Sequence, residues 1–240
     1  MMDDVLKSKK YKNLDPEVIA DVISKYNVSA SDKRTREYRQ ALKAVKRELH
    51  KIYAMYNVNH KLIERKLSSF LSGDSSAVFD ILNSHVSTRE RIPYYREFWD
   101  FVLSYKPRTI TDLACGLNPF SLALIKPSFE YTAVDVDKKL IGLIDKFLSG
   151  INVEHSVRTE NILNHHYKSD VILLLKSLTI LYKQDSNVFN WLKSLRGKVI
   201  VSLPTRSLVS RKPLDNSWIE EKIDFVEKIS FPGEDVYVLA

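Results

Sequence analysis

The sequence predicts an α/β fold, with a helical N-terminal domain (1–105) followed by a Rossmann-like, doubly wound sheet (106–240) that ends in an antiparallel hairpin. Three observations predict it. Apolar residues recur at helical spacing up to about residue 104, and from Arg108 onward short apolar runs alternate with helical stretches. The last two apolar runs follow each other with no helix between them. A chain of 240 residues, 44% of them hydrophobic, can bury the cores that this fold needs.

Helix signals punctuate the first hundred residues. Asp15 and Pro16 are a capping acid and a first-turn proline, and Ser31 or Asp32 can cap a longer helix that runs to about Tyr56. An apolar stripe follows that helix at spacings of three and four residues, at Leu42, Val45, Leu49, Ile52 and Met55 or Tyr56. Further helices are expected over 59–71, 75–83 and 88–104.

The second part alternates strands and helices. Strands are expected at 109–113, 130–135, 151–157, 170–175 and 198–203, and helices near 119–125, 138–148 and 185–195. The runs 222–229 and 236–239 then form the hairpin. Ligands of such a sheet collect at the carboxyl ends of its strands.

Charge divides the chain unevenly. The formal net charge is +7, and residues 1–66, with 16 Lys and Arg against 9 Asp and Glu, already supply +7. A neutral domain with a basic extension suggests a polyanionic partner, most commonly nucleic acid, although a solvated helix surface would carry the same charge.

Composition removes several classes of protein. Cys115 is the only cysteine, so neither an intramolecular disulfide nor a Cys-rich zinc site is available, and we expect no metal site. We expect Cys115 to be a small buried hydrophobe. No segment resembles a signal peptide or a membrane span, which predicts a cytoplasmic protein without a membrane partner.

The stretch Asp112-Leu-Ala-Cys-Gly-Leu-Asn-Pro119 has the character of a cofactor loop. Ala114 and Gly116 are small enough for the backbone to approach a ligand, Asn118 tolerates a left-handed turn, and Pro119 suits the start of a helix. Asp135 closes the next strand, where an acid would accept ribose hydroxyls. Two glycines of the dinucleotide pattern are missing, which disfavours a nicotinamide-dependent oxidoreductase and favours S-adenosyl-L-methionine, a cofactor without phosphate.

Several motifs resemble those of the aminoglycoside-resistance 16S ribosomal RNA methyltransferases of the Arm/Rmt type. They occur in order from about residue 5 to about residue 208: Ser8–Tyr11, Leu49-His50, His85–Arg91, Asp112–Pro119, Leu174–Leu178 and Ser202–Leu208. The resemblance implies a class I methyltransferase sheet and methylation of N7 of a guanine in the decoding site, within the small ribosomal subunit. Aminoglycoside resistance would follow, and we expect a monomer.

Matched to the family position by position, the cofactor contacts would fall on Tyr56, His85, Val86, Ser87, Arg91, Ala114, Gly116, Asp135, Asn161, Ile162, Leu175 and Gln184. The resemblance implies that Arg91 forks onto the methionine carboxylate, Asp135 binds the ribose and Asn161 meets the adenine amine. Asn161 departs from the family, in which an acid is usual at that position.

The RNA would be held by basic residues of both parts, which are Lys9, Lys10, Arg34, Arg39, Lys46, Arg206 and Arg211. Arg206 follows the last parallel strand and would orient the target base, and no general base is identified. Beyond Arg206 the family's Gly-Lys-Gly-Met segment is replaced by Ser210–Asp215. Two alternatives therefore stay open: a housekeeping methyltransferase acting on another rRNA base, and a catalytically silent RNA-binding relative.

Overall fold

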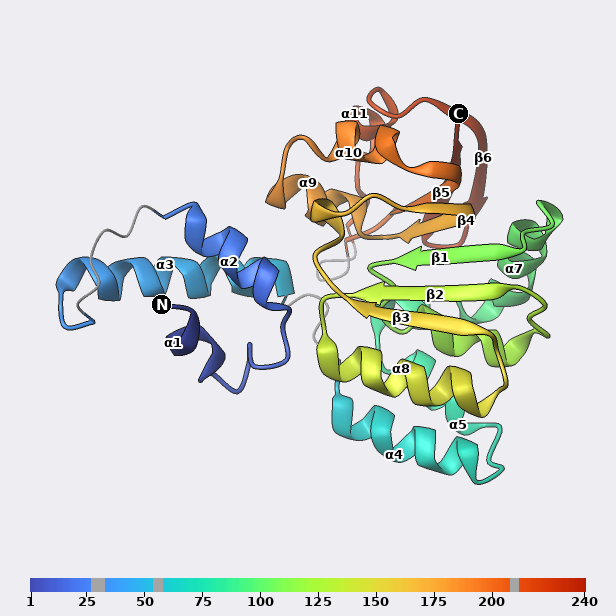
Figure 1. The fold of residues 1–240 in the computed structure, drawn as a ribbon. Coiled ribbons are helices and arrows are strands. Elements are labelled where there is room, and N and C mark those ends of the chain that lie inside the picture. The colour runs from blue at the N-terminus through green and yellow to red at the C-terminus, as the bar shows by residue number, and fades with distance from the viewer. Residues whose placement is uncertain (27–32, 54–57, 208–211) are drawn as a thin grey trace.

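A computed structural model describes residues 1–26, 33–53, 58–207 and 212–240. Seven strands form one sheet in the order β3-β2-β1-β4-β5-β7-β6. The first five are parallel, and β7 pairs antiparallel with both β5 and β6. The α/β class, the Rossmann-like sheet and its C-terminal hairpin are therefore confirmed (Figure 1). The strands are β1 (Thr109–Leu113), β2 (Glu130–Asp135), β3 (His155–Thr159), β4 (Lys168–Leu175), β5 (Arg196–Pro204), β6 (Phe225–Phe231) and β7 (Glu234–Leu239).

Helices cover both faces of the sheet, and each face has its own apolar core. One core joins the sheet to α4 (His60–Leu71), α5 (Ala77–Asn83), α7 (Tyr95–Ser104) and α8 (Lys138–Gly150). The other joins it to α9 (Leu178–Gln184), α10 (Val188–Ser194) and α11 (Ser217–Glu220). Burying both faces explains the uninterrupted apolar runs of β4 and β5, at 171–175 and 199–201.

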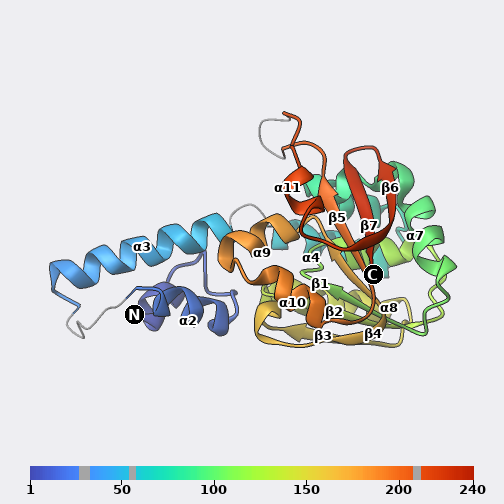
Figure 2. The same cartoon turned by 90° about the horizontal axis from the view of Figure 1, so that it is seen from above.

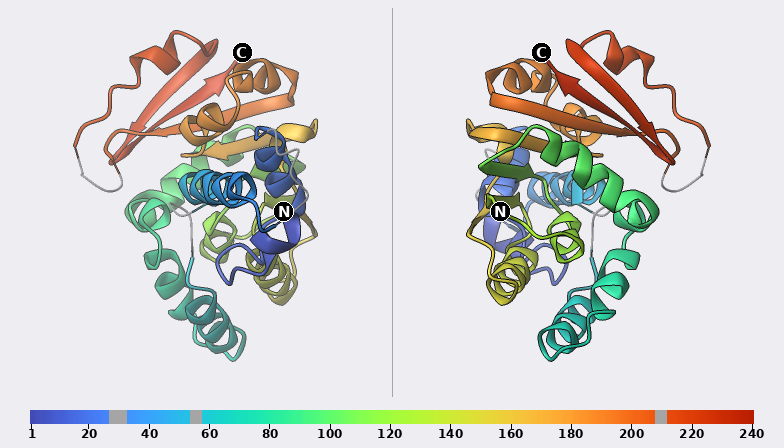
Figure 3. Two further views of the ribbon diagram at one scale, coloured as in Figure 1. Left: turned by 90° about the vertical axis from the view of Figure 1, so that its left-hand side faces the viewer. Right: turned by 90° about the vertical axis from the view of Figure 1, so that its right-hand side faces the viewer.

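A third core is formed by the N-terminal segment. The helices α1 (Met2–Leu6), α2 (Pro16–Ser24) and α3 (Arg36–Tyr53) enclose Val5, Ile19, Val45 and Leu49. We call residues 1–53 the N-terminal lobe and the remainder the body. The lobe projects beyond the carboxyl ends of β1, β2 and β3, as Figure 2 shows from above and Figure 3 from the side.

The separation of the cores does not coincide with the predicted boundary at residue 105. Ile63, Ile81 and Trp99 lie between 58 and 104, yet they are fully buried in the core that includes the sheet. We therefore propose that the division between the parts falls between residues 53 and 58. Helical spacing alone could not reveal it, because an apolar stripe does not say which partner will cover it.

Several helix predictions are confirmed and others need correction. Asp15 caps α2 by accepting the Glu17 N–H at 2.7 Å, and α4 and α5 lie where helices are predicted. The predicted helix over 88–104 is instead three pieces, α6 (Val86–Arg89), the 3-10 turn η2 (Ile92–Tyr94) and α7, because Pro93 cannot donate within a continuous helix. The proposed caps Ser31 and Asp32 lie outside the described residues.

In the body the strand positions are confirmed except at β3 and at β6, which runs from Phe225 to Phe231 rather than over 222–229. The strand β3 begins at His155 rather than at 151, because α8 continues to Gly150 and Asn152 adopts a left-handed conformation with φ 55°. The segment predicted as a helix near 119–125 is the 3-10 helix η3 (Asn118–Leu124). The helices α9 and α11 were not predicted.

Candidate functional site

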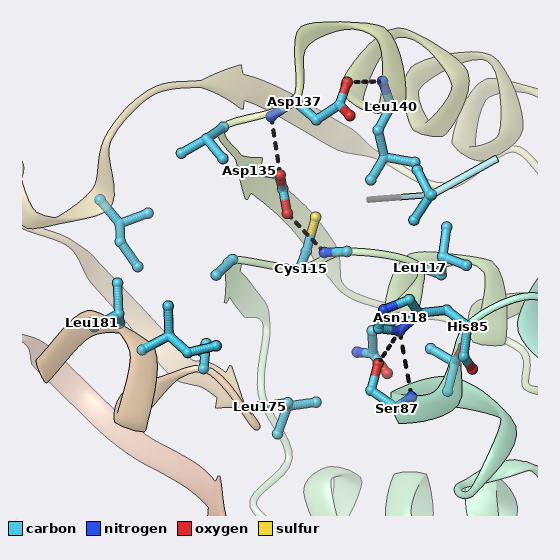
Figure 4. A pocket seen from close by; sticks show the side chains of 18 of the residues that line it. His85, Ser87, Cys115, Leu117, Asn118, Asp135, Asp137, Leu140, Leu175 and Leu181 are labelled. Carbon is cyan, nitrogen blue, oxygen red and sulfur yellow. Dashed lines mark hydrogen bonds between the residues drawn. The ribbon is translucent and has the colours of Figure 1, made fainter. Parts of the chain in front are cut away.

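A pocket opens at the carboxyl ends of the parallel strands, at the point where the strand order reverses between β1 and β4. This is where a doubly wound sheet binds its ligand. Ten of the twelve predicted cofactor residues line the pocket: His85, Ser87, Arg91, Ala114, Gly116, Asp135, Asn161, Ile162, Leu175 and Gln184 (Figure 4). Val86 is not part of the lining, and Tyr56 lies outside the described residues.

The loop after β1 brings its backbone to the pocket through two left-handed residues. Ala114 has φ 51° and Gly116 has φ 50°, so the chain reverses tightly at the end of the strand. A Cβ added at Gly116 would meet no atom within 4 Å, so the backbone conformation rather than crowding favours glycine there. Asn118 was expected to supply the left-handed turn, and this expectation is wrong, because Asn118 begins the helix η3.

Asp135 is fixed at the end of β2 by two backbone donors. Gly116 N–H donates to Oδ2 and Asp137 N–H donates to Oδ1, both at 3.0 Å. Each oxygen keeps a lone pair for a further donor. Burial raises the pKa of Asp135 to about 6, although the two N–H groups lower it in part. A carboxylate so placed suits the two hydroxyls of a ribose.

The pocket walls around Asp135 are mostly apolar. Two residues of the lining, His85 and Asp137, are the N-caps of helices. His85 Nδ1 caps α6, accepting the Ser87 N–H at 3.3 Å and lying 2.7 Å from Ser87 Oγ. Asp137 caps α8 and also lies 2.7 Å from His60 Nε2. Cys115 is buried, which raises its thiol pKa well above the ordinary value and confirms that it packs as a hydrophobe.

Arg91 lines the pocket and also forms a buried ion pair that the sequence does not predict. Its Nε and Nη2 donate to the two oxygens of Glu234 at 2.5 and 2.6 Å, and Nη1 donates to Asn118 Oδ1 at 3.3 Å. Both charged side chains are buried. Burial alone would raise the pKa of Glu234, but the adjacent guanidinium outweighs this and holds it at about 2. Glu234 thus occupies the Nε–Nη2 edge of the guanidinium, and Arg91 lines the pocket as part of a buried ion pair, while its expected contact with a cofactor carboxylate stays a prediction.

Sequence reasoning missed other residues of the lining. Ser177 follows β4, and among the residues that the structure describes its Oγ is one of three buried side-chain atoms without a hydrogen-bond partner. A ligand donor or acceptor would satisfy it. The further lining residues are Val18, Val58, Thr88, Cys115, Leu117, Asn118, Val136, Asp137, Leu140, Ile180 and Leu181. Val18 comes from the lobe, and no motif marks it.

The predicted RNA-binding residues lie mostly on the lobe. Lys9, Lys10, Arg34 and Arg39 are exposed, and Lys46 is partly exposed on α3. Lys10 Nζ hydrogen-bonds His50 Nδ1, and the Tyr11 hydroxyl donates to the Lys46 carbonyl at 2.9 Å, which ties the start of the chain to α3.

Arg206 is exposed just beyond the end of β5, in a loop whose two sides pair at Arg206 and Pro213. It therefore stands at the same edge of the sheet as the pocket, although it is not part of the lining. Arg211 lies outside the described residues.

Comparisons with known proteins agree on one family. The ribosomal RNA methyltransferase (FmrO) family matches residues 7–224. The 16S rRNA (guanine(1405)-N(7))-methyltransferase of Micromonospora echinospora is 32% identical over 226 residues, which cover 86% of this chain and 80% of that protein. The enzyme of the same name from Proteus mirabilis is 25% identical over an alignment of 271 positions, which covers 98% of this chain and 94% of that protein.

Solved structures show the same fold. The crystal structure of the 16S rRNA methyltransferase RmtF in complex with S-adenosyl-L-homocysteine is 26% identical, with a TM-score of 0.82, and the match covers 99% of this chain and 95% of that one. The 16S rRNA methylase RmtB gives the same TM-score and coverage at 24% identity, which supports the fold. Within the described residues no helix combines the length and the apolar character needed to cross a membrane.

Proposed function

Because the chain belongs to the FmrO family of ribosomal RNA methyltransferases, we infer that it transfers a methyl group from S-adenosyl-L-methionine to N7 of a guanine in 16S ribosomal RNA. The observation that carries this function is the pocket at the carboxyl ends of β1 and β2, with Asp135 held at its centre, beside a basic lobe. The guanine modified by the relatives, number 1405, is the expected target.

The residues of the pocket fit this cofactor. Asp135 offers two carboxylate oxygens to the ribose hydroxyls, and the tight turn at Ala114 and Gly116 lets the chain approach it closely. Leu175 supplies an apolar wall, and the unpartnered Ser177 Oγ suits a polar group of the methionine part. Arg91, which lines the pocket, is held by Glu234 and in turn donates to Asn118, another residue of the lining.

The reaction does not require the protein to remove a proton from the nucleophile. The cofactor supplies an activated methyl group on a sulfonium, and guanine N7 already carries the lone pair that attacks it. No general base is needed for this attack. The protein contributes alignment of the two reactants and exclusion of water. Arg206, at the rim, is the residue we propose to orient the target nucleotide through its phosphate or base.

We propose that the lobe docks the RNA. Thirteen Lys and Arg residues against eight Asp and Glu residues lie in positions 1–53, and the lobe extends from the edge that holds the pocket. Phosphate contacts made by the N-terminal lobe can therefore bring a base of the RNA to the pocket at the strand ends of the body. The assembled small subunit is the proposed substrate, in the cytoplasm, and we propose that the chain acts on it as a monomer.

The test is methylation of purified small subunits with labelled cofactor, followed by mapping of the modified nucleotide. N7-methylguanine makes the RNA cleavable by reduction and aniline, and we expect a single cleavage at the relatives' guanine, absent with the Asp135→Ala variant. Cells that express the protein should tolerate gentamicin-type and kanamycin-type drugs. Label on an adenine or pyrimidine would assign the housekeeping alternative. Subunit and cofactor binding without methyl transfer would identify a silent relative.

A further inference from the structure

The seam between the N-terminal lobe and the body runs along the cofactor pocket. Asp15 N–H donates to the Val136 carbonyl, and Lys138 N–H donates to the Asn13 carbonyl, both at 2.8 Å. Val136 lines the pocket and also packs against the core of the lobe. Val18, on α2, lines the pocket from the other side of the seam. The lobe is therefore part of the wall of the pocket as well as a neighbour of it.

One acid of α2 reaches across this seam to two amides of the body. Asp21 Oδ2 accepts from Asn161 Nδ2 at 2.7 Å and from Asn164 Nδ2 at 3.0 Å. Asn161 is buried and lines the pocket, and its Oδ1 accepts the Leu163 N–H at 3.3 Å. A carboxylate only accepts hydrogen bonds, so it fixes which end of the Asn161 amide faces the lobe.

The position of Asn161 indicates what the fixed amide recognises. It follows β3, which lies beside β2, whose last residue Asp135 is the ribose acceptor in the proposed function. In the proposed function, a base attached to that ribose would reach the end of the next strand, at Asn161, which also lines the pocket. Adenine presents a 6-amino donor there, and an acceptor must face it. With Nδ2 committed to Asp21, one lone pair of Oδ1 remains for that donor.

We propose that Asp21 is a specificity-determining positioning residue, which orients the Asn161 amide to accept the adenine amine and so makes the lobe part of the cofactor site. This inference rests on the proposed function. An amide that lacked this partner could turn over and present a donor to another donor. The same contact couples cofactor binding to packing of the lobe against the body. By thermodynamic linkage, the free energy by which the packed lobe strengthens cofactor binding equals that by which the cofactor strengthens the packing of the lobe.

Calorimetry on the full chain tests this, with S-adenosylhomocysteine and its inosine analogue, in which an oxygen replaces the 6-amino group. Asp21→Ala should bind S-adenosylhomocysteine about fivefold to tenfold more weakly, the size of one net hydrogen bond. Its discrimination against the inosine analogue should fall by a similar factor. Asp3→Ala, an exposed acid of the same lobe, makes the same charge change away from the seam and should leave both values unchanged.

A swap of the pair separates positioning from stability. Asn161→Asp alone would set two carboxylates against each other at the seam and weaken cofactor binding. Asp21→Asn with Asn161→Asp restores a donor and an acceptor, with their direction reversed, and should recover affinity and discrimination to within about threefold. Unchanged discrimination in Asp21→Ala, or a double variant no better than Asn161→Asp, would overturn the inference alone. Failure of the unaltered protein to bind S-adenosylhomocysteine would overturn the proposed function and this inference together.

Discussion

Replacing Asp135 by alanine should remove most of the cofactor affinity. Both carboxylate oxygens already accept a backbone N–H, from Gly116 and Asp137, and each keeps a lone pair toward the pocket. Hydrogen bonds to a charged acceptor contribute about 1.5–3 kcal/mol each. Loss of two such bonds to the ribose therefore costs at least about 3 kcal/mol, a decrease of roughly 100-fold in affinity.

The assay is calorimetric titration with S-adenosylhomocysteine. Alanine also leaves the two N–H groups without an acceptor, so Asp135→Asn is measured beside it, because the amide oxygen keeps one acceptor and should lose only about tenfold. Asp145→Ala, at an exposed position of α8, is the matched control. Nicotinamide dinucleotides should not bind to any of these proteins. Binding by Asp135→Ala within threefold of the unaltered protein would refute the assignment of the ribose site.

Three further predictions concern pH, stability and RNA. Burial raises the pKa of Asp135 to about 6, so the ionised fraction of this carboxyl falls from about nine-tenths at pH 7 to about one-tenth at pH 5. Calorimetry should therefore show S-adenosylhomocysteine binding about tenfold more weakly at pH 5. An equally steep decline in Asp135→Asn would assign the pH dependence to another group. Glu234→Gln leaves Arg91 buried without its counter-ion and should lower the free energy of unfolding in urea at neutral pH by about 3–5 kcal/mol. Because the folded-state pKa of Glu234 lies below its ordinary 4.5, the stabilisation by this pair is present above pH 4.5 and is lost as the pH falls toward about 2, which acid titration of the two proteins will check. Reversing the charges of Lys9, Arg39 and Lys46 should weaken small-subunit binding. It should also lower the slope of log affinity against log salt concentration by roughly 0.7–0.9 per lost phosphate contact, and an unchanged slope would mean that the basic helices are only a solvated surface. Arg206→Ala should instead reduce turnover and leave subunit binding largely intact.

Local chemistry made much of this protein predictable. The alternation of apolar runs and helices after Arg108 determines a parallel sheet, and the spacing from Gly116 to Asp135 places an acid at the end of the second strand. Capping pairs such as Asp15 with Pro16 act within a few residues, so they can be read directly from the sequence. The pocket contains ten of the residues that the family resemblance implied, and those that follow strands lie together because strand ends in a parallel sheet meet at one edge.

Contacts between distant segments were decided only by the tertiary structure. Nothing in the sequence around Arg91 indicates that Glu234, 143 residues later, pairs with its guanidinium. The helices between residues 58 and 104 belong to the body rather than to the lobe, because their apolar stripes are buried in the core that includes the sheet. Asp21 and Asn161 stand 140 residues apart, and nothing in either local sequence pairs them. The sequence specifies which groups are available, whereas the partner of each buried charge and each apolar face depends on how the elements pack.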